Sequence, residues 1–217
     1  MKVKFNKCSK IDKSKIVDAV HKKEDIEFEG YTVTRDFQMM ANQILAAFLS
    51  ACNKERFLSS LSYSSSELLG NADKANIKRC FCKECNLDIN NPLDYEAAMI
   101  DFKMEISSNL DHYRELQKKN RLYVKYRLSY NDGIITLSII NKATLTEAEK
   151  NRISKKLERA KQYHSIEEAY LTIDQSEGSG LGIIIIVLML KQIGLGPECF
   201  NIESKNGETI SSVLIPA

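Results

Sequence analysis

Apolar residues in the first half of the chain recur at steps of three and four, the spacing that places them on one face of a helix. The clearest face follows a polar stretch at 3–35 and begins at Asp36, which we expect to be the N-cap. Asn91-Pro92 marks the start of another long helix. The predicted elements are a short helix at 12–21, a short strand at 31–34, and helices at 36–59, 65–81 and 93–119.

The second half contains runs rich in β-branched and aromatic residues, joined by strong turn signals. "RLYVKYRLSY" and "IITLSII" flank Asn131-Asp132-Gly133, and "CFNIES" and "TISSVLIP" flank Asn206-Gly207, so each pair predicts an antiparallel hairpin. Capping boxes at 146–149 and 165–168 predict helices at 147–162 and 166–172. Helices segregated from a mostly antiparallel sheet are typical of an α+β fold arranged as a two-layer sandwich.

Three glycines lie close together in "SEGSGLGIIIIVLMLKQIG", just before eight apolar residues. Glycine permits positive φ and close backbone approach, which suits a phosphate-binding loop, but it also suits any sharp turn. The isoleucines that follow favour a buried strand on propensity, whereas a phosphate-binding loop requires a helix there. These residues alone leave both interpretations open.

The helix at 65–81 carries a polar face. Glu67, Asn71, Lys74 and Lys78 are spaced by four, three and four residues, so they share one side of the helix. A carboxylate, a carboxamide and two amines suit Mg²⁺-nucleotide chemistry, because oxygen atoms bind the cation and amines attract phosphate. The alternative is structural: Ser64 and Glu67 match a capping box, and such charges are common on solvated faces.

Two motifs together resemble a family. "ELLGNADKA" looks like the N-box and "EGSGLGI" like the second glycine box of the GHKL ATPase superfamily, and the first is closest to the histidine kinase-like branch. The resemblance covers about 60–217 and implies the Bergerat-type two-layer α/β sandwich. Residues 1–59 would then be an N-terminal extension with a long amphipathic helix, 82–120 a helical insertion, and 146–177 the ATP lid, a mobile element in the family.

The resemblance also implies roles for individual residues. Asn71 would coordinate Mg²⁺ with the nucleotide, Glu67 would act as base or water-orienting carboxylate, and Lys74 would face the phosphates. The glycine box would bring backbone amides to the phosphates at the start of a helix at about 181–193, ended by Gly194. The expected ATP-binding positions are Asn71, Lys74, Lys78, Asn141, Gly178, Ser179, Gly180, Leu181 and Gly182.

The chain departs from the family pattern at three places. Asn141 stands where the family has an Asp that accepts a hydrogen bond from adenine, and no glycine follows it; an adenine contact and a simple strand end are both open. Residues 1–64 are too short for a phosphoacceptor hairpin, so we expect the phosphoacceptor on a separate partner protein. Residues 82–120 form an insertion that simple histidine kinases lack. The long helix of this insertion and the helix at 36–59 have apolar stripes that fit core packing, or else a partner or homodimer surface.

Composition narrows the class without deciding the chemistry. A net charge of +2 gives no indication of nucleic-acid binding, and no apolar run is long enough for a membrane span, so we expect a cytoplasmic protein. The six cysteines are then expected to be reduced thiols. The cluster Cys80, Cys82 and Cys85 also permits a zinc site, with Cys52 or His112 as fourth ligand.

The motifs and their order favour an intracellular signalling protein that binds Mg-ATP and acts as a kinase or ATPase on a separate partner. One alternative is a non-catalytic, nucleotide-responsive interaction module, which the altered Asn141 region favours. Another is a serine kinase of the anti-sigma type.

Overall fold

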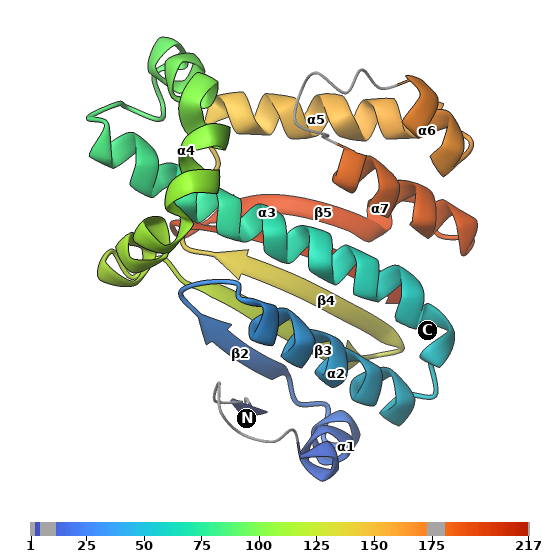
Figure 1. Cartoon of the computed structure of the whole chain (residues 1–217). Coiled ribbons are helices and arrows are strands. Elements are labelled where there is room, and N and C mark those ends of the chain that lie inside the picture. Colours follow the sequence, from blue (N-terminus) through green and yellow to red (C-terminus); the bar gives the residue numbers. More distant parts are fainter. Residues whose placement is uncertain (1–2, 5–11, 173–180, 217) are drawn as a thin grey trace.

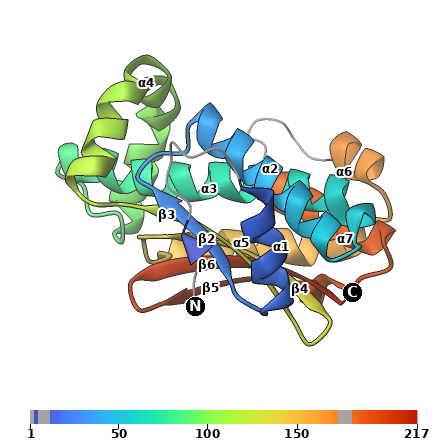
Figure 2. The same cartoon turned by 90° about the horizontal axis from the view of Figure 1, so that it is seen from below.

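The computed structural model describes residues 3–4, 12–172 and 181–216. In this part of the chain, helices lie over one face of a mostly antiparallel sheet, as Figures 1 and 2 show, so the expected α+β class is confirmed. The strands are β1 (Val3–Lys4), β2 (Ile26–Gly30), β3 (Val124–Asn131), β4 (Ile134–Asn141), β5 (Phe200–Lys205) and β6 (Glu208–Pro216). Their order across the sheet is β1-β2-β3-β4-β6-β5, and the β1–β2 pair is parallel.

The helices follow the sequence pattern closely in number and less closely in their ends. The α-helices are α1 (Lys13–His21), α2 (Arg35–Ala51), α3 (Leu58–Glu84), α4 (Pro92–Lys119), α5 (Glu147–Gln162), α6 (Ile166–Thr172) and α7 (Leu181–Gln192). Two short 3₁₀ turns, η1 (Glu55–Phe57) and η2 (Pro197–Cys199), precede α3 and β5.

Both predicted hairpins are present with the expected tight turns. Asp132 and Gly133 have φ of 52° and 77°, and Asn206 and Gly207 have φ of 54° and 77°. Two successive residues with positive φ give a turn whose twist matches that of the flanking strands. Helix α7 ends at Gln192, close to the expected end, and Gly194 follows it with a φ of 79°.

Two predicted elements of the N-terminal part, a strand and a helix, were wrong in position. The strand of this region lies at Ile26–Gly30 rather than at 31–34, because "IEFEG" pairs antiparallel with β3. Thr34, not Asp36, caps α2: its hydroxyl oxygen accepts a hydrogen bond from Phe37 N at 3.3 Å. That helix ends at Ala51 rather than at 59, and Asn53, with a φ of 56°, follows its C-cap.

The helix predicted at 65–81 is longer and begins at Leu58. Ser64 therefore lies inside it, and its hydroxyl donates to the carbonyl oxygen of Ser60 at 2.8 Å. The proposed capping box of Ser64 and Glu67 was wrong, since neither residue is at a helix end. This correction removes helix capping as an explanation for the Glu67 carboxylate.

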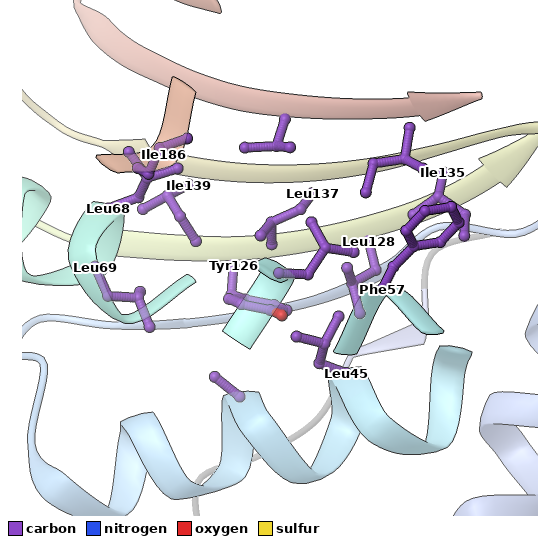
Figure 3. Close-up of a cluster of buried hydrophobic side chains, with 14 of the residues drawn as sticks. Leu45, Phe57, Leu68, Leu69, Tyr126, Leu128, Ile135, Leu137, Ile139 and Ile186 are labelled. Atoms are coloured by element: carbon purple, nitrogen blue, oxygen red, sulfur yellow. The ribbon is translucent and has the colours of Figure 1, made fainter. Parts of the chain in front are cut away.

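The main core lies between the sheet and helices α2, α3 and α7. Figure 3 shows Tyr126, Leu137 and Ile139 of the strands facing Leu68 of α3 and Ile186 of α7. The predicted N-terminal extension, residues 1–59, contributes to the same cluster: Ile44 and Phe48 of α2 are fully buried in it. Helix α7 is apolar nearly all round, and this burial outweighs the strand preference of its isoleucines.

A second, smaller cluster forms where α4 packs on the C-terminal part of α3. It centres on Ile77, Phe81 and Tyr113, and Phe102 packs against it. The apolar stripes of α2 and α4 are thus used mainly in packing. Figures 1 and 2 show α4 at the end of α3 that lies away from α1.

Candidate functional site

A cavity of about 910 Å³ opens beside the polar face of α3, between that helix, α4, α5 and the start of α7. We call it the α3 cavity. Five lysine or arginine side chains and two glutamates line it, so it suits an anionic ligand, and its volume is that of a small-molecule site. The predicted site residues that line it are Glu67, Asn71, Lys74, Lys78, Asn141, Leu181 and Gly182.

The remaining predicted positions, Gly178, Ser179 and Gly180, lie outside the described residues, as do residues 173–177 of the predicted lid. Gly194 follows the end of α7 as described above. The structure therefore brings together every predicted site residue that it describes, from segments that are more than a hundred residues apart in the sequence.

At one end of the α3 cavity, Glu67 lies directly against the first turn of α7. A Cβ atom added to Gly182 would be only 1.9 Å from Glu67 Oε1, so the Glu67 side chain occupies this place only because residue 182 is a glycine. Asn71 Nδ2 donates a hydrogen bond to Glu67 Oε1 at 3.2 Å. Because that bond uses the nitrogen, Asn71 Oδ1 is the atom left to bind a cation.

Two groups beside this end add to its electrostatics. Lys74 is exposed and makes no hydrogen bond or ion pair with the described residues, so its ammonium is available to an anion. Burial, together with the negative charge of Glu67 and the nearby phenol of Tyr170, raises the pKa of Tyr63 to about 12. The first turn of α7 contributes partial positive charge from its open amides.

At the other end, Asn141 is the last residue of β4 and is 3% exposed. Alternation along the strand places it on the same side as Leu137 and Ile139, toward the helices. Its Nδ2 donates to Asn76 Oδ1 of α3 at 3.2 Å. Asn76 in turn donates from Nδ2 to the backbone carbonyl oxygens of residues 122 and 123, at 3.2 and 3.0 Å.

Lys78 already has a partner. Its ammonium contacts Glu149 Oε1 at 3.1 Å and Tyr95 Oη at 3.2 Å. Arg79 donates to the two oxygens of Glu149 at 2.9 and 2.5 Å. The predicted phosphate contact of Lys78 stays a prediction, but its charge is at present compensated by a carboxylate of α5.

Glu149 joins helix α5 to α3. It is 8% exposed, and its carboxylate also accepts from the amide of Thr146 at 3.1 Å, completing the predicted capping box. Burial alone raises the pKa of Glu149, but the hydrogen bond and charge of Arg79 and the charge of Lys78 outweigh it and lower the pKa to about 2. Glu149 is therefore ionised throughout the neutral range.

Sequence reasoning missed Asn76 and the second role of Glu149. The available signal for Asn76 was a polar residue among the apolar positions of α3, since buried carboxamides are nearly always hydrogen-bonded. The pairing of Glu149 with Arg79 had no local signal, because the two residues are 70 positions apart.

The zinc interpretation of the cysteine cluster has no support. Within residues 3–4, 12–172 and 181–216, no group of three or more His, Cys, Asp or Glu side chains is placed to hold a metal ion. His112 instead contacts Glu84 at 2.7 Å. Burial raises the pKa of Cys80 to about 11, which keeps its thiol protonated at neutral pH.

Comparisons with known proteins give one relative and no family. An uncharacterized protein of Treponema pallidum (strain Nichols) is 36% identical over 207 residues, which are 95% of this chain and 40% of that protein. The chain thus spans about two fifths of the length of this relative. No protein-family model matches the chain. No solved structure matches it either. Among the described helices, none is both long and apolar enough to span a bilayer.

Proposed function

We propose that the α3 cavity binds Mg-ATP and that the chain is a histidine kinase-like ATPase domain with a Bergerat-type fold. The contact between Glu67 and Gly182 carries this proposal. These residues belong to the two motifs that resemble the N-box and the second glycine box, and Gly182 has no room for a Cβ beside the carboxylate. A cationic cavity extends from this contact to Asn141, as a nucleotide site requires.

The residues of the cavity fit the proposed ligand group by group. Asn71 Oδ1 would hold the metal, because Asn71 Nδ2 is used by Glu67. Bound Mg²⁺ would neutralise phosphate charge. Lys74 and the amides that open α7 would contact phosphate oxygens, and Glu67 would orient or deprotonate the attacking group.

As a signalling protein, the chain would act as a kinase or ATPase toward a separate partner protein. A serine kinase of the anti-sigma type is one form of this activity, and it predicts that label from γ-labelled ATP reaches a serine of the partner.

A second candidate function is a nucleotide-responsive module without catalysis. The pairing of Lys78 with Glu149 favours it, because that pair neutralises one of the cations expected at the phosphates and ties α5 to α3. Both functions require nucleotide binding, and they differ in whether replacing Glu67 abolishes a turnover.

Isothermal titration with Mg-ATP and Mg-ADP tests the shared claim. We expect binding that depends on Mg²⁺ and that Asn71→Ala weakens about tenfold or more, since a contact to a charged group contributes about 1.5–3 kcal/mol. Asn201→Ala is the control, an exposed carboxamide on β5 whose neighbour Ile202 lines the cavity while Asn201 does not. No binding by the unaltered protein would refute the proposal.

A further inference from the structure

Two buried carboxamides are in contact beside the α3 cavity: Asn141, which lines it, and Asn76, which lies behind Asn141. Asn76 is 0% exposed, and its Nδ2 lies 3.2 and 3.0 Å from the carbonyl oxygens of Leu122 and Tyr123. A carbonyl oxygen can only accept, so the atom of Asn76 that faces both must be its nitrogen. The backbone before β3 therefore fixes which way the Asn76 carboxamide points, and its oxygen is turned toward Asn141.

The orientation of the Asn76 carboxamide in turn fixes that of Asn141. Asn76 Oδ1 is an acceptor, so the atom of Asn141 that bonds it at 3.2 Å must be Nδ2. This leaves Asn141 Oδ1 as a hydrogen-bond acceptor in a side chain that lines the cavity and is 3% exposed. In the part of the chain that the structure describes, no donor reaches this oxygen.

The neighbouring strand β6 also places a hydrogen-bond acceptor beside Asn141. Thr209 of β6 pairs with Asn141 in the sheet and also lines the cavity. Its hydroxyl donates to the carbonyl oxygen of Ala143 at 2.6 Å, so its hydrogen is already used. Thr209 Oγ1 also accepts from Ser204 Oγ at 3.4 Å, so one of its lone pairs remains, and Asn141 Oδ1 is the acceptor that a complementary ligand meets with a hydrogen-bond donor.

We propose that Asn76 is a positioning residue that holds Asn141 with its oxygen toward the cavity and so makes the site select a base with an exocyclic amino group, a 6-aminopurine. This inference rests on the proposed nucleotide function and adds to it a residue that sets specificity. The departure from Asp to Asn at 141 then keeps an acceptor at the base end, because Asn76 fixes the carboxamide in one of its two orientations.

The selectivity has a physical cause that can be measured. A ligand without the amino group leaves the buried oxygen of Asn141 unpaired, which weakens binding by about 10- to 100-fold. Without Asn76 the carboxamide of Asn141 can rotate, and either its oxygen or its nitrogen can face the base. The penalty for lacking the amino group should then nearly vanish.

The experiment compares two ligands, Mg-ATP and the Mg-triphosphate of purine riboside, which lacks only the 6-amino group. Each is titrated into the unaltered protein and into Asn76→Ala, Asn141→Ala and Gln117→Ala. Gln117 is a matched control, because it is another buried carboxamide bonded to α3, through Asp73, but it does not line the cavity. Thermal unfolding confirms that each variant is folded.

We expect the unaltered protein and Gln117→Ala to prefer ATP by about tenfold or more, and both asparagine variants to prefer it by less than about threefold. A purely structural role of Asn76 would instead weaken both ligands equally and keep their ratio, which overturns the inference. Should Asn76→Ala not fold, Asn76→Leu, which keeps the size of the side chain and removes its hydrogen bonds, decides by the same ratio. Equal binding of the two ligands by the unaltered protein refutes the inference alone, whereas binding of neither refutes the proposed function as well.

Discussion

Two asparagine side chains, Asn71 and Asn141, each offer an oxygen to the α3 cavity, and they are oriented by different kinds of neighbour. Asn71 is half-buried and donates to the carboxylate of Glu67. Asn141 is buried and donates to Asn76, which is itself held by two backbone carbonyls. One orientation thus depends on the carboxylate to which the proposed function gives a role in the chemistry, and the other depends on backbone carbonyls, which can only accept hydrogen bonds.

This difference indicates a division of labour along the cavity. At the Asn141 end, fixed acceptors can recognise a base without rearrangement, which lowers the cost of binding. At the Asn71 end, Glu67, Lys74 and the amides of α7 face the place where charge would change during phosphate chemistry. Changes at the first end should alter stability and selectivity for the base, and changes at the second should alter turnover and the affinity for Mg-ATP.

The largest effect on stability is expected from breaking the ion pairs of Glu149, which join α5 to α3. Glu149→Ala leaves Arg79 and Lys78 without their carboxylate, and removing one partner of a buried ion pair costs about 3 kcal/mol or more. Urea unfolding at pH 7 measures it. The control is Glu147→Ala, an exposed carboxylate in the same first turn, for which a change below about 0.5 kcal/mol is expected.

The ion pairs of Glu149 also predict that the stability of the protein depends on pH in the acid range. Because the pKa of Glu149 is lowered to about 2 in the folded protein, its contribution is present above its ordinary value of 4.5 and is lost as the pH falls toward 2. The stability difference between the unaltered protein and Glu149→Ala should therefore shrink between about pH 5 and pH 2. A difference that stays constant over this range would contradict the ion pair.

The next largest effect concerns turnover. Glu67→Gln keeps the size of the side chain but removes its charge, so the catalytic function predicts a loss of about 100-fold in ATP turnover with nucleotide binding retained. Ser66→Ala, the exposed neighbour, should leave turnover unchanged. An unaltered protein that binds Mg-ATP without turning it over would favour the non-catalytic module instead.

A smaller effect is expected from crowding the contact between α3 and α7. Gly182→Ala places a Cβ 1.9 Å from Glu67 Oε1, so Glu67 must move and Asn71 loses the partner that orients it. We expect Mg-ATP affinity to fall about tenfold in the titration. Gly70→Ala, on the same helix α3 with nothing within 4 Å of the added atom, should leave affinity unchanged and raise stability by about 0.5 kcal/mol. Equal effects of the two variants would contradict this packing argument.

Sequence patterns located several elements from strong turn and cap signals. Asp132-Gly133 and Asn206-Gly207 located both hairpins, and Thr146 with Glu149 located α5. They failed where the signal was weak: the break after Ala51 is made by Asn53 in the left-handed region, without a glycine or proline, so α2 was predicted to be too long.

For the candidate site, the sequence predicted which residues share a helix face but not which partners they contact. The periodicity of α3 predicted that Glu67, Asn71, Lys74 and Lys78 share a face, and the structure places all four along one cavity. Periodicity carried no information on which partner each would have. The contacts of Asn141 with Asn76 and of Arg79 with Glu149 join residues 65 and 70 positions apart, so only the folded chain shows them.

A crystal structure with Mg²⁺ and a non-hydrolysable ATP analogue tests the central claim most directly, because it examines both ends of the α3 cavity at once. We predict the cation on Asn71 Oδ1, the phosphates at the start of α7, and the amino group of adenine within hydrogen-bonding distance of Asn141 Oδ1. A nucleotide bound outside the cavity, or one with its base beside Glu67 and its phosphates beside Asn141, would contradict it.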